Sequence, residues 1–353
     1  MKKILLVALA AITLASCAKN EVVELNEGNA ISFRAWTENA SRKAPTTTAS
    51  IADFDVWAYL SDETLYMDAF KVSGGTGAWD YDNHKFWPEG TVDFFAFSPA
   101  AVADGVVADA EKDELVIAGF TQTNVLGDQI DLLYAATLGQ TRAANATGVN
   151  MVFDHALSLI SFKALNSNTA GMKVTISGVS IDNVSDTATF THPLTATAEN
   201  DDVTAGVDRA KWSAWDAKDA TYAAGMENAD YLVTDASVEI TEDAAGRLLL
   251  IPQEGTAWTP GAVDEGARFI VTCKIQDTDT GVYLLGDSSN YGEVAIPFTP
   301  NWHPGKHYIY TFQFGEGAGY DPLTGTPIVA PINFNEIVVD DFAAGANAGV
   351  DAL

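Results

Sequence analysis

The sequence predicts an all-β protein, organised as two β-sandwich domains in tandem. Three observations predict this class: short segments alternate apolar and polar residues, Gly- and Pro-containing turns separate them, and candidate helices are few. This pattern is typical of sandwiches, whereas a doubly wound sheet alternates its strands with helices. A length of 353 residues fits two domains of roughly 150 residues each.

Period-two alternation marks strand candidates along both halves of the chain, because successive side chains of a strand point to opposite faces. Four segments show it clearly: residues 54–60, 91–97, 173–177 and 307–314. Turn-forming pairs separate the strand candidates: Gly74-Gly75, Asp104-Gly105, Pro260-Gly261 and Pro304-Gly305. Two Ala-rich stretches, residues 100–110 and 216–229, are helix candidates that Gly interrupts.

A small, polar stretch near the middle of the chain separates the two predicted domains. Residues 131–135 resemble a closing strand, residues 139–148 are small and polar, and a new strand candidate begins at residue 149. We therefore expect an N-terminal domain over residues 44–146 and a C-terminal domain over residues 147–326. The sequence contains no clean short-period repeat, which argues against solenoids and propellers.

The start of the chain carries its most informative motif. Two lysines precede an apolar stretch over residues 4–14, which is too short to span a bilayer. The stretch leads into the tetrapeptide Leu-Ala-Ser-Cys, ending at Cys17, which resembles a bacterial lipobox. The motif predicts a signal peptide over residues 1–16, cleavage before Cys17 and acylation of that cysteine. Two alternatives stay open: an ordinary signal peptide with an incidental cysteine, and a membrane-anchor helix.

Strong acidity excludes one class of partner. The chain has 48 Asp and Glu residues against 19 Lys and Arg residues, for a formal net charge of −29. Such a protein repels nucleic acid and anionic lipid headgroups. We predict no nucleic-acid partner and no polybasic contact with a membrane.

The second of the two cysteines, Cys273, is expected to have a structural role. Cys273 shares one face of a strand candidate with Phe269, Val271 and Ile275. We expect a buried, small apolar side chain there rather than a reactive thiol. With Cys17 assigned to lipid, the mature chain has no internal disulfide, so its stability must come from the core.

A set of segments, taken in order, carries a family resemblance. These segments are residues 30–35, 54–59, 85–88, 92–99, 153–163, 302–310 and 332–334. In order and spacing the chain resembles the fimbrillin family, whose members are subunits of type V pili, and the resemblance covers nearly the whole mature chain. It implies two β-sandwich domains of transthyretin-like or Greek-key topology.

The resemblance also implies a route of assembly. In the family, a lipoprotein precursor reaches the outer membrane, and a surface trypsin-like protease cuts after a basic residue beyond the first strand. That strand leaves an apolar groove, and the C-terminal segment of the next subunit fills it by β-augmentation. The implied partners are other pilus subunits, the protease and the lipid anchor. The implied place is the fimbrium, where the subunit supports adhesion. We predict no cofactor.

The N-terminal part of the chain has the residues that this route needs. On the candidate first strand, Ile31, Phe33 and Ala35 share one face. Arg42 begins a basic pair in a polar stretch beyond this strand, which makes it the predicted processing site. Arg34 is an alternative cut site.

The two ends of the mature chain are assigned accordingly. Residues 17–43 form the lipidated segment with the removable first strand, and residues 327–353 form the donor segment. An open alternative is that the apolar run in the latter segment completes the second sandwich as an internal strand. The predicted donor-strand residues are Ile328, Ile332, Phe334 and Val338.

Catalytic and metal-binding patterns are weak. Among the five histidines, His303 and His307 lie four apart, but a Pro-Gly pair between them prevents a shared helical face. Asp154, His155 and Ser158 are adjacent in sequence, which does not supply the geometry of a catalytic triad. We predict no metal and no enzymatic activity, and a hydrolase using paired carboxylates is the least favoured alternative.

Eight tryptophans support the main alternative function, a surface glycan-binding lipoprotein. Exposed, coplanar indole rings would favour this alternative, whereas most of these residues lie in or beside strand candidates, where packing is expected. The candidates are Trp79, Trp87, Trp212, Trp215, Trp258 and Trp302.

Overall fold

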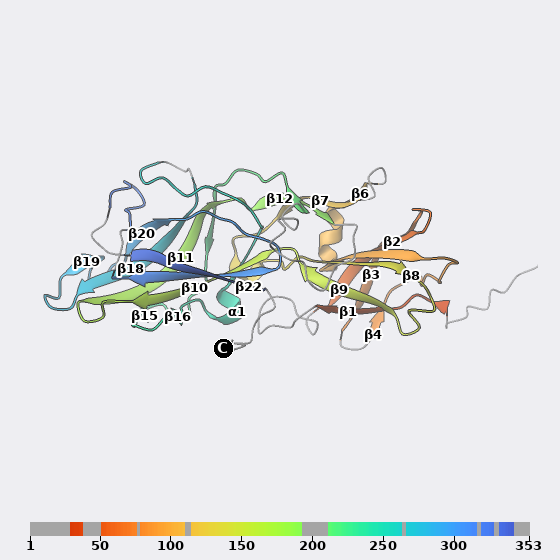
Figure 1. Ribbon diagram of the computed structural model, residues 1–353, viewed down its shortest axis with the longest axis horizontal. Helices are drawn as coiled ribbons and strands as arrows, with labels where there is room; N and C mark the ends of the chain where they lie inside the picture. Colours follow the sequence, from red (N-terminus) through yellow and green to blue (C-terminus); the bar gives the residue numbers. More distant parts are fainter. Residues whose placement is uncertain are drawn as a thin grey trace, which may run out of the picture.

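The computed structural model describes residues 29–37, 51–75, 78–109, 114–192, 211–262, 266–315, 319–327 and 332–341. Nearly all regular structure in these residues is β-strand, which confirms the predicted all-β class. The strands form four sheets, arranged along an elongated molecule with two lobes (Figure 1).

The first lobe, on the right in Figure 1, is built from a seven-stranded and a four-stranded sheet. The strands of the larger sheet are β1 (Phe33–Thr37), β2 (Asp53–Leu60), β3 (Leu65–Gly75), β4 (Ala78–Asp80), β5 (Val92–Ser98), β8 (Leu133–Gln140) and β9 (Val149–His155). The strands of the smaller sheet are β6 (Val106–Asp109), β7 (Glu114–Thr121), β12 (Thr187–His192) and β13 (Trp212–Ser213). Their orders are β1-β9-β8-β5-β2-β3-β4 and β13-β12-β7-β6.

The second lobe is a sandwich of a five-stranded and a six-stranded sheet. The five-stranded sheet contains β10 (Ser158–Asn166), β16 (Val238–Glu239), β17 (Leu248–Leu250), β21 (Lys306–Phe314) and β22 (Ile332–Asp341). The six-stranded sheet contains β11 (Met172–Val184), β14 (Ala220–Ala223), β15 (Tyr231–Leu232), β18 (Arg268–Asp277), β19 (Tyr283–Leu285) and β20 (Gly292–Pro297). The main paths are β16-β10-β21-β22 and β14-β11-β18-β19, with β17 on β10, β15 on β11 and β20 on β18.

Helical pieces in the described residues are short. They are the 3-10 helices η2 (Ala100–Gly105) and η3 (Leu126–Asp128) and the helix α1 (Asp243–Gly246). The helix expected over residues 216–229 is wrong, because this stretch contains β14, paired with β11. The candidate over residues 100–110 begins as η2 and continues into β6. None of the helices in the described segments has the length and apolar character to cross a membrane.

Strand pairing runs across the middle of the chain. β9 follows the boundary expected at residue 147, yet it pairs with β8 and with β1 in the first lobe. β12 likewise comes from the second half of the chain and pairs with β7. Segments from both halves therefore build the first lobe.

The seven-stranded sheet buries both of its faces. Phe97 of β5 faces the four-stranded sheet, with its ring centre 5.9 Å from that of Phe190. Phe94, on the same strand, faces a second apolar cluster made by the sheet curling on itself. A strand covered on both faces reads as an almost continuous apolar run, which explains the Phe-Phe-Ala-Phe sequence of β5.

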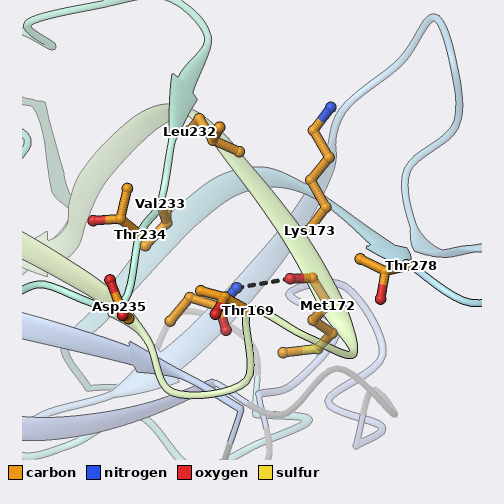
Figure 2. Close-up of a pocket in the computed structure, with 9 residues that line it drawn as sticks. Thr169, Met172, Lys173, Leu232, Val233, Thr234, Asp235 and Thr278 are labelled. Carbon is orange, nitrogen blue, oxygen red and sulfur yellow. Dashed lines mark hydrogen bonds between the residues drawn. The ribbon is translucent and has the colours of Figure 1, made fainter.

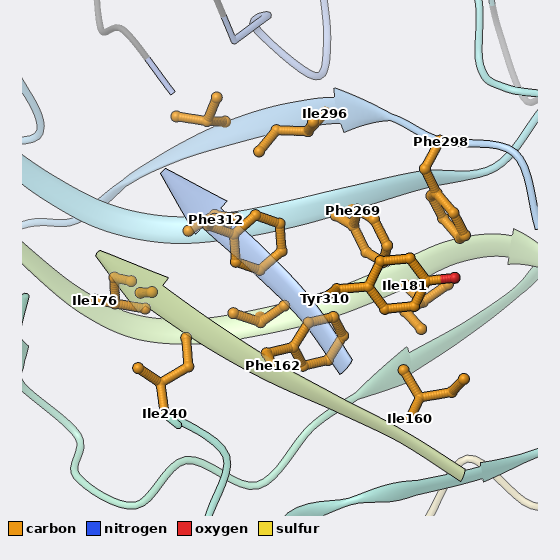
Figure 3. Close-up of a cluster of buried hydrophobic side chains, with 14 of the residues drawn as sticks. Ile160, Phe162, Ile176, Ile181, Ile240, Phe269, Ile296, Phe298, Tyr310 and Phe312 are labelled. Carbon is orange, nitrogen blue, oxygen red and sulfur yellow. The ribbon is translucent and has the colours of Figure 1, made fainter. Parts of the chain in front are cut away.

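The second lobe has an aromatic core between its two sheets (Figure 3). Phe162 of β10 and Phe312 of β21 stack with ring centres 5.6 Å apart, and Phe269 of β18 lies 4.8 Å from Tyr310. Cys273 is fully buried in this core, as predicted, and burial raises the pKa of its thiol. Burying each large apolar side chain contributes about 1.5–3 kcal/mol.

Candidate functional site

The candidate site is the slot in the first lobe that β1 occupies. β1 lies at one end of the seven-stranded sheet and pairs in parallel with β9, with Phe33 opposite Val149. The predicted alternation is confirmed, because Ser32 and Arg34 are exposed. The buried side chains are Ile31, Phe33 and Ala35, with exposed fractions of 1%, 4% and 7%.

Phe33 is the largest of these buried side chains and sits among aromatic rings. Its ring centre lies 5.6 Å from that of Phe94, 5.6 Å from that of Tyr81 and 6.1 Å from that of Phe54. These edge and tilted contacts are typical of aromatic packing in a core. Removal of β1 would therefore open an aromatic pocket to water.

Residues 85–87 pair with the N-terminal end of this strand. We call them the second wall of the slot, β9 being the first. The Ile31 N–H donates to the Lys85 carbonyl oxygen at 2.8 Å, and the Trp87 N–H donates to the Asn29 carbonyl oxygen at 3.0 Å. Ala30 and Phe86 form the antiparallel bridge between these two hydrogen bonds. The sheet thus curls until residues 85–87 meet the strand that begins the described chain.

Tyr81 adds a side-chain contact to this wall. Its hydroxyl donates to the Ile31 carbonyl oxygen at 2.9 Å and accepts from the Lys85 N–H at 3.2 Å. Burial raises the pKa of Tyr81 to about 12, so the hydroxyl keeps its proton at neutral pH. Sequence reasoning missed Tyr81, because nothing in the local pattern distinguishes it from any other core aromatic.

Gly148 lies against the exposed side of the same strand. Its φ is +110°, a conformation that favours glycine, and a Cβ atom there would lie 3.2 Å from the Ser32 hydroxyl oxygen. The Val149 N–H donates to the Ser32 carbonyl oxygen at 2.7 Å. The small, polar stretch that precedes β9 is therefore shaped to receive the first strand.

Of the two cut sites considered, one can be placed. Arg34 lies within the paired part of β1, with Asn150 as its register partner. A protease needs an accessible, extended segment, and pairing to β9 denies it one at Arg34. Arg42, like Cys17, lies outside the described residues, so both stay predictions.

The C-terminal strand pairs within its own chain. β22 is antiparallel to β21 and forms one end of the five-stranded sheet. Val338 is half-buried, whereas its neighbour Val339 is 51% exposed. Ile332 and Phe334 are described by their backbone alone, opposite Phe314 and Phe312, and Ile328 lies outside the described residues.

This placement agrees with the alternative that the segment completes the second sandwich in the isolated chain. An end strand has one neighbour, so it can leave without disturbing the order of the others. The donor assignment of the four residues stays a prediction.

The histidines are structural where they are described. His155 Nδ1 lies 3.0 Å from the Asp131 carboxylate, whereas the Ser158 hydroxyl donates to the His303 carbonyl oxygen at 2.7 Å. The sequence neighbours Asp154, His155 and Ser158 are thus not assembled as a relay. In the described part of the chain, no cluster of three or more His, Cys, Asp or Glu side chains could hold a metal.

The tryptophans pack rather than display their rings. Trp212, Trp258 and Trp302 are buried, while Trp79, Trp87 and Trp215 are half-buried against the cores of the first lobe. No tryptophan side chain that the structure describes is exposed, so the platform expected of a glycan-binding surface is not formed by these residues.

A pocket of about 440 Å³ lies at the end of the second lobe, beside β15 (Figure 2). Lys173 and Asp235 give its lining one cation and one carboxylate. The lining has no histidine or cysteine, and the Asn166 amide is already bonded to the Met172 carbonyl oxygen at 2.9 Å. The pocket therefore offers no histidine imidazole or cysteine thiol for nucleophilic catalysis.

The fold and the β1 slot together define a class: tandem β-sandwich proteins whose first core is completed by a single strand at a sheet end. Comparison with known sequences agrees, because a model of fimbrillin-like proteins matches residues 23–333. The chain belongs to the fimbrillin-like family, which confirms the resemblance seen in the sequence.

Individual relatives show how far the likeness extends. Fimbrium subunit Fim1C of Phocaeicola vulgatus is 26% identical over 189 residues, covering 45% of this chain and 50% of the relative. The chain thus spans about half the length of this curated relative. A fimbrial protein of Bacteroides vulgatus, solved by crystallography, shares the fold with a TM-score of 0.56 and 16% identity. That match covers 89% of this chain and 99% of the other.

Proposed function

We propose that this chain is a structural subunit of a type V pilus, exported as a lipoprotein and polymerised by strand exchange after proteolysis. The observation that carries the proposal is the position of β1, a single strand that pairs with β9 at the end of its sheet. It completes the first core with Ile31 and Phe33. Loss of such a strand leaves both unpaired backbone groups and an apolar slot, which are the two elements that a foreign strand can satisfy.

Processing after Arg42 would release this strand. Residue 42 follows the last residue of β1, Thr37, by five positions. A cut there separates β1 from the rest of the lobe while leaving β2 to β9 intact. The freed strand is then held only by noncovalent contacts, so it can dissociate.

The C-terminal segment is the proposed replacement. It shares an Ile-x-Phe pattern with the first strand: Ile332 and Phe334 correspond to Ile31 and Phe33. Its strand β22 lies at a sheet end in the isolated chain. After transfer to a neighbouring copy, this segment would no longer pair with β21, and it would take a position in the core of the next subunit.

The test is a trypsin digestion of the purified full-length protein. We expect an early cut after Arg42, an N terminus at Lys43, and a ladder of oligomers that persists in detergent without heating. A variant with Arg42→Ala and Lys43→Ala should stay uncut at this place and monomeric. Arg142→Ala is the matched control, since Arg142 is an exposed basic residue in a turn of the same lobe.

Two results would contradict the proposal. A ladder in the doubly substituted variant would move the processing site elsewhere. Complete cutting after Arg42 without any oligomer would show that removal of β1 does not lead to strand exchange.

A further inference from the structure

The slot that β1 fills is lined differently at its two ends. Residues 33–37 pair with β9, and the Ser32 carbonyl oxygen accepts from the Val149 N–H. Residues 29–31 instead pair with residues 85–87. Any strand that replaces β1 must therefore form backbone hydrogen bonds with residues 85–87 near its start and with β9 further along.

The second wall uses only some backbone groups of its strand. The Ile31 N–H donates to the carbonyl oxygen of Lys85, and the Asn29 carbonyl oxygen accepts from the Trp87 N–H. The Ile31 carbonyl oxygen accepts from the Tyr81 hydroxyl. Ala30 forms the non-hydrogen-bonded pair with Phe86, so its N–H makes no bond to this wall. A proline is therefore compatible with the Ala30 position.

We infer that the incoming segment binds in one register, with Ile332 of a second copy in the place of Ile31 and Phe334 in the place of Phe33. This inference rests on the proposed strand exchange. The register puts Pro331 at the Ala30 position, where no N–H is needed by residues 85–87. The incoming strand runs parallel to β9, and the Tyr81 hydroxyl donates to the carbonyl oxygen of Ile332.

The polar residues of the segment fit the same register. Asn333 falls at the exposed Ser32 position, and Asn335 falls at the exposed Arg34 position. Among the positions whose burial is described, 29–35, the mismatch is Glu336, which falls at the position of Ala35, 7% exposed.

Other registers conflict with the groove. A shift of one residue turns both asparagines into the core. A shift of two residues in one direction moves Glu336 from the Ala35 position into the pocket of Phe33, which is less exposed and enclosed by aromatic rings, so the unpaired charge is still more unfavourable there. The opposite shift of two brings the Phe334 ring to the place of the Ala35 methyl group, which overpacks the site.

Disulfide trapping distinguishes these registers. Asn150 is exposed and is the register partner of Arg34, so Asn150→Cys on the acceptor should cross-link to Asn335→Cys on the donor. Donors carrying Asn333→Cys or Ile337→Cys should not cross-link at this position. Cys273 is buried and does not compete. In uncut protein, Arg34→Cys with Asn150→Cys is the control for whether this site accepts a disulfide.

The outcomes separate the register from the exchange. Oligomers that trap at residue 333 or 337 would overturn the register and leave strand exchange intact. Trypsin-cut protein that forms no oligomers would overturn both. Trapping at residue 335 alone supports the inference.

Affinity gives a second measurement. A synthetic peptide of residues 328–340 serves as the probe, and its binding to cut protein is measured by inhibition of oligomer growth. Tyr81→Phe in the protein should weaken binding of this peptide about threefold to tenfold, which corresponds to the loss of one hydrogen bond.

Glu336→Ala in the peptide should tighten binding about tenfold, because it removes a charge from a buried position. Asn335→Ala, at an exposed position, is the matched control, and unchanged or weaker binding of the Glu336→Ala peptide would overturn the register.

Discussion

The guanidinium carbon of Arg268 lies 4.9 Å from the centre of the Trp258 ring. The same side chain donates from Nη1 to the Pro322 carbonyl oxygen at 3.1 Å and lies 3.4 Å from the Asp182 carboxylate. The Tyr320 ring also contacts Trp258, with the two ring centres 6.3 Å apart. Together these contacts fasten the segment of residues 319–327 onto the six-stranded sheet.

This fastened segment lies between β21 and β22 in the chain. Tyr320 also exchanges two backbone hydrogen bonds with Ala295 of β20, at 2.7 and 3.0 Å. A C-terminal strand that leaves for another subunit starts from this anchored segment, so the contacts of Tyr320 should limit its freedom.

Tyr320→Ala should loosen the segment without unfolding the lobe. Loss of the aromatic contact removes about 0.5–1.5 kcal/mol, so hydrogen exchange of residues 319–327 should quicken several-fold while the melting temperature stays within a few degrees. Exchange measured by mass spectrometry checks this expectation. Leu323→Ala is the control, because Leu323 is 92% exposed. Equal exchange in both variants and the wild type would show that Tyr320 does not hold the segment.

Phe33→Ala should destabilise the uncut protein strongly. The ring is 4% exposed and contacts three other aromatic rings, and truncating such a residue typically costs about 3–5 kcal/mol. Denaturant unfolding of the uncut chain measures the change. Arg34→Ala, on the exposed face of the same strand, should lose at most about 1 kcal/mol, because an exposed charged side chain contributes little. Similar losses for the two variants would mean that β1 does not contribute to the core through its buried face.

His307 should make the second lobe less stable in acid. Burial, with the charges of Arg247 and Lys163, lowers the pKa of His307 to about 3 from 6.5. The unfolded chain therefore binds the proton first, and stability falls as the pH drops from 6.5 towards 3, by at most about 1.4 kcal/mol per unit.

His307→Gln should flatten this part of the pH profile relative to the wild type. The substitution keeps a polar group beside the Ser161 hydroxyl, which lies 2.8 Å from His307 Nε2. Unfolding free energies measured at several pH values give the difference between the two proteins. His84→Gln is the control, because His84 is exposed and its pair with Asp80 lies on the surface, where such pairs contribute little. Parallel profiles for His307→Gln and the wild type would show that this histidine is not the source of the dependence.

Cys17→Ala should abolish lipid attachment and surface delivery. The expectation comes from the lipobox-like end of the apolar leader, because acylation requires the cysteine itself. Metabolic labelling with a fatty-acid probe measures it. Cys273→Ala should label like the wild type, and a labelled Cys17→Ala variant would disprove the assignment.

Local patterns predicted much of the fold and one face of the site. Alternation in the sequence identified Ile31, Phe33 and Ala35 as one buried face, since the period of a strand is a local property. The same reasoning assigned Cys273 to the core with Phe269 and Ile275. The helix expected over residues 216–229 failed because pairing of β14 with β11 outweighed the local preference for a helix.

The sequence by itself determined the all-β class, the buried face of the first strand and the family. The tertiary structure alone decided that β1 pairs in parallel with β9, that β22 returns to β21, and that Tyr81 reaches the Ile31 carbonyl oxygen. Each of these relationships joins residues from different segments of the chain. Side-chain periodicity specifies which face of a strand is buried, but the choice of partner depends on the packing of the whole sheet.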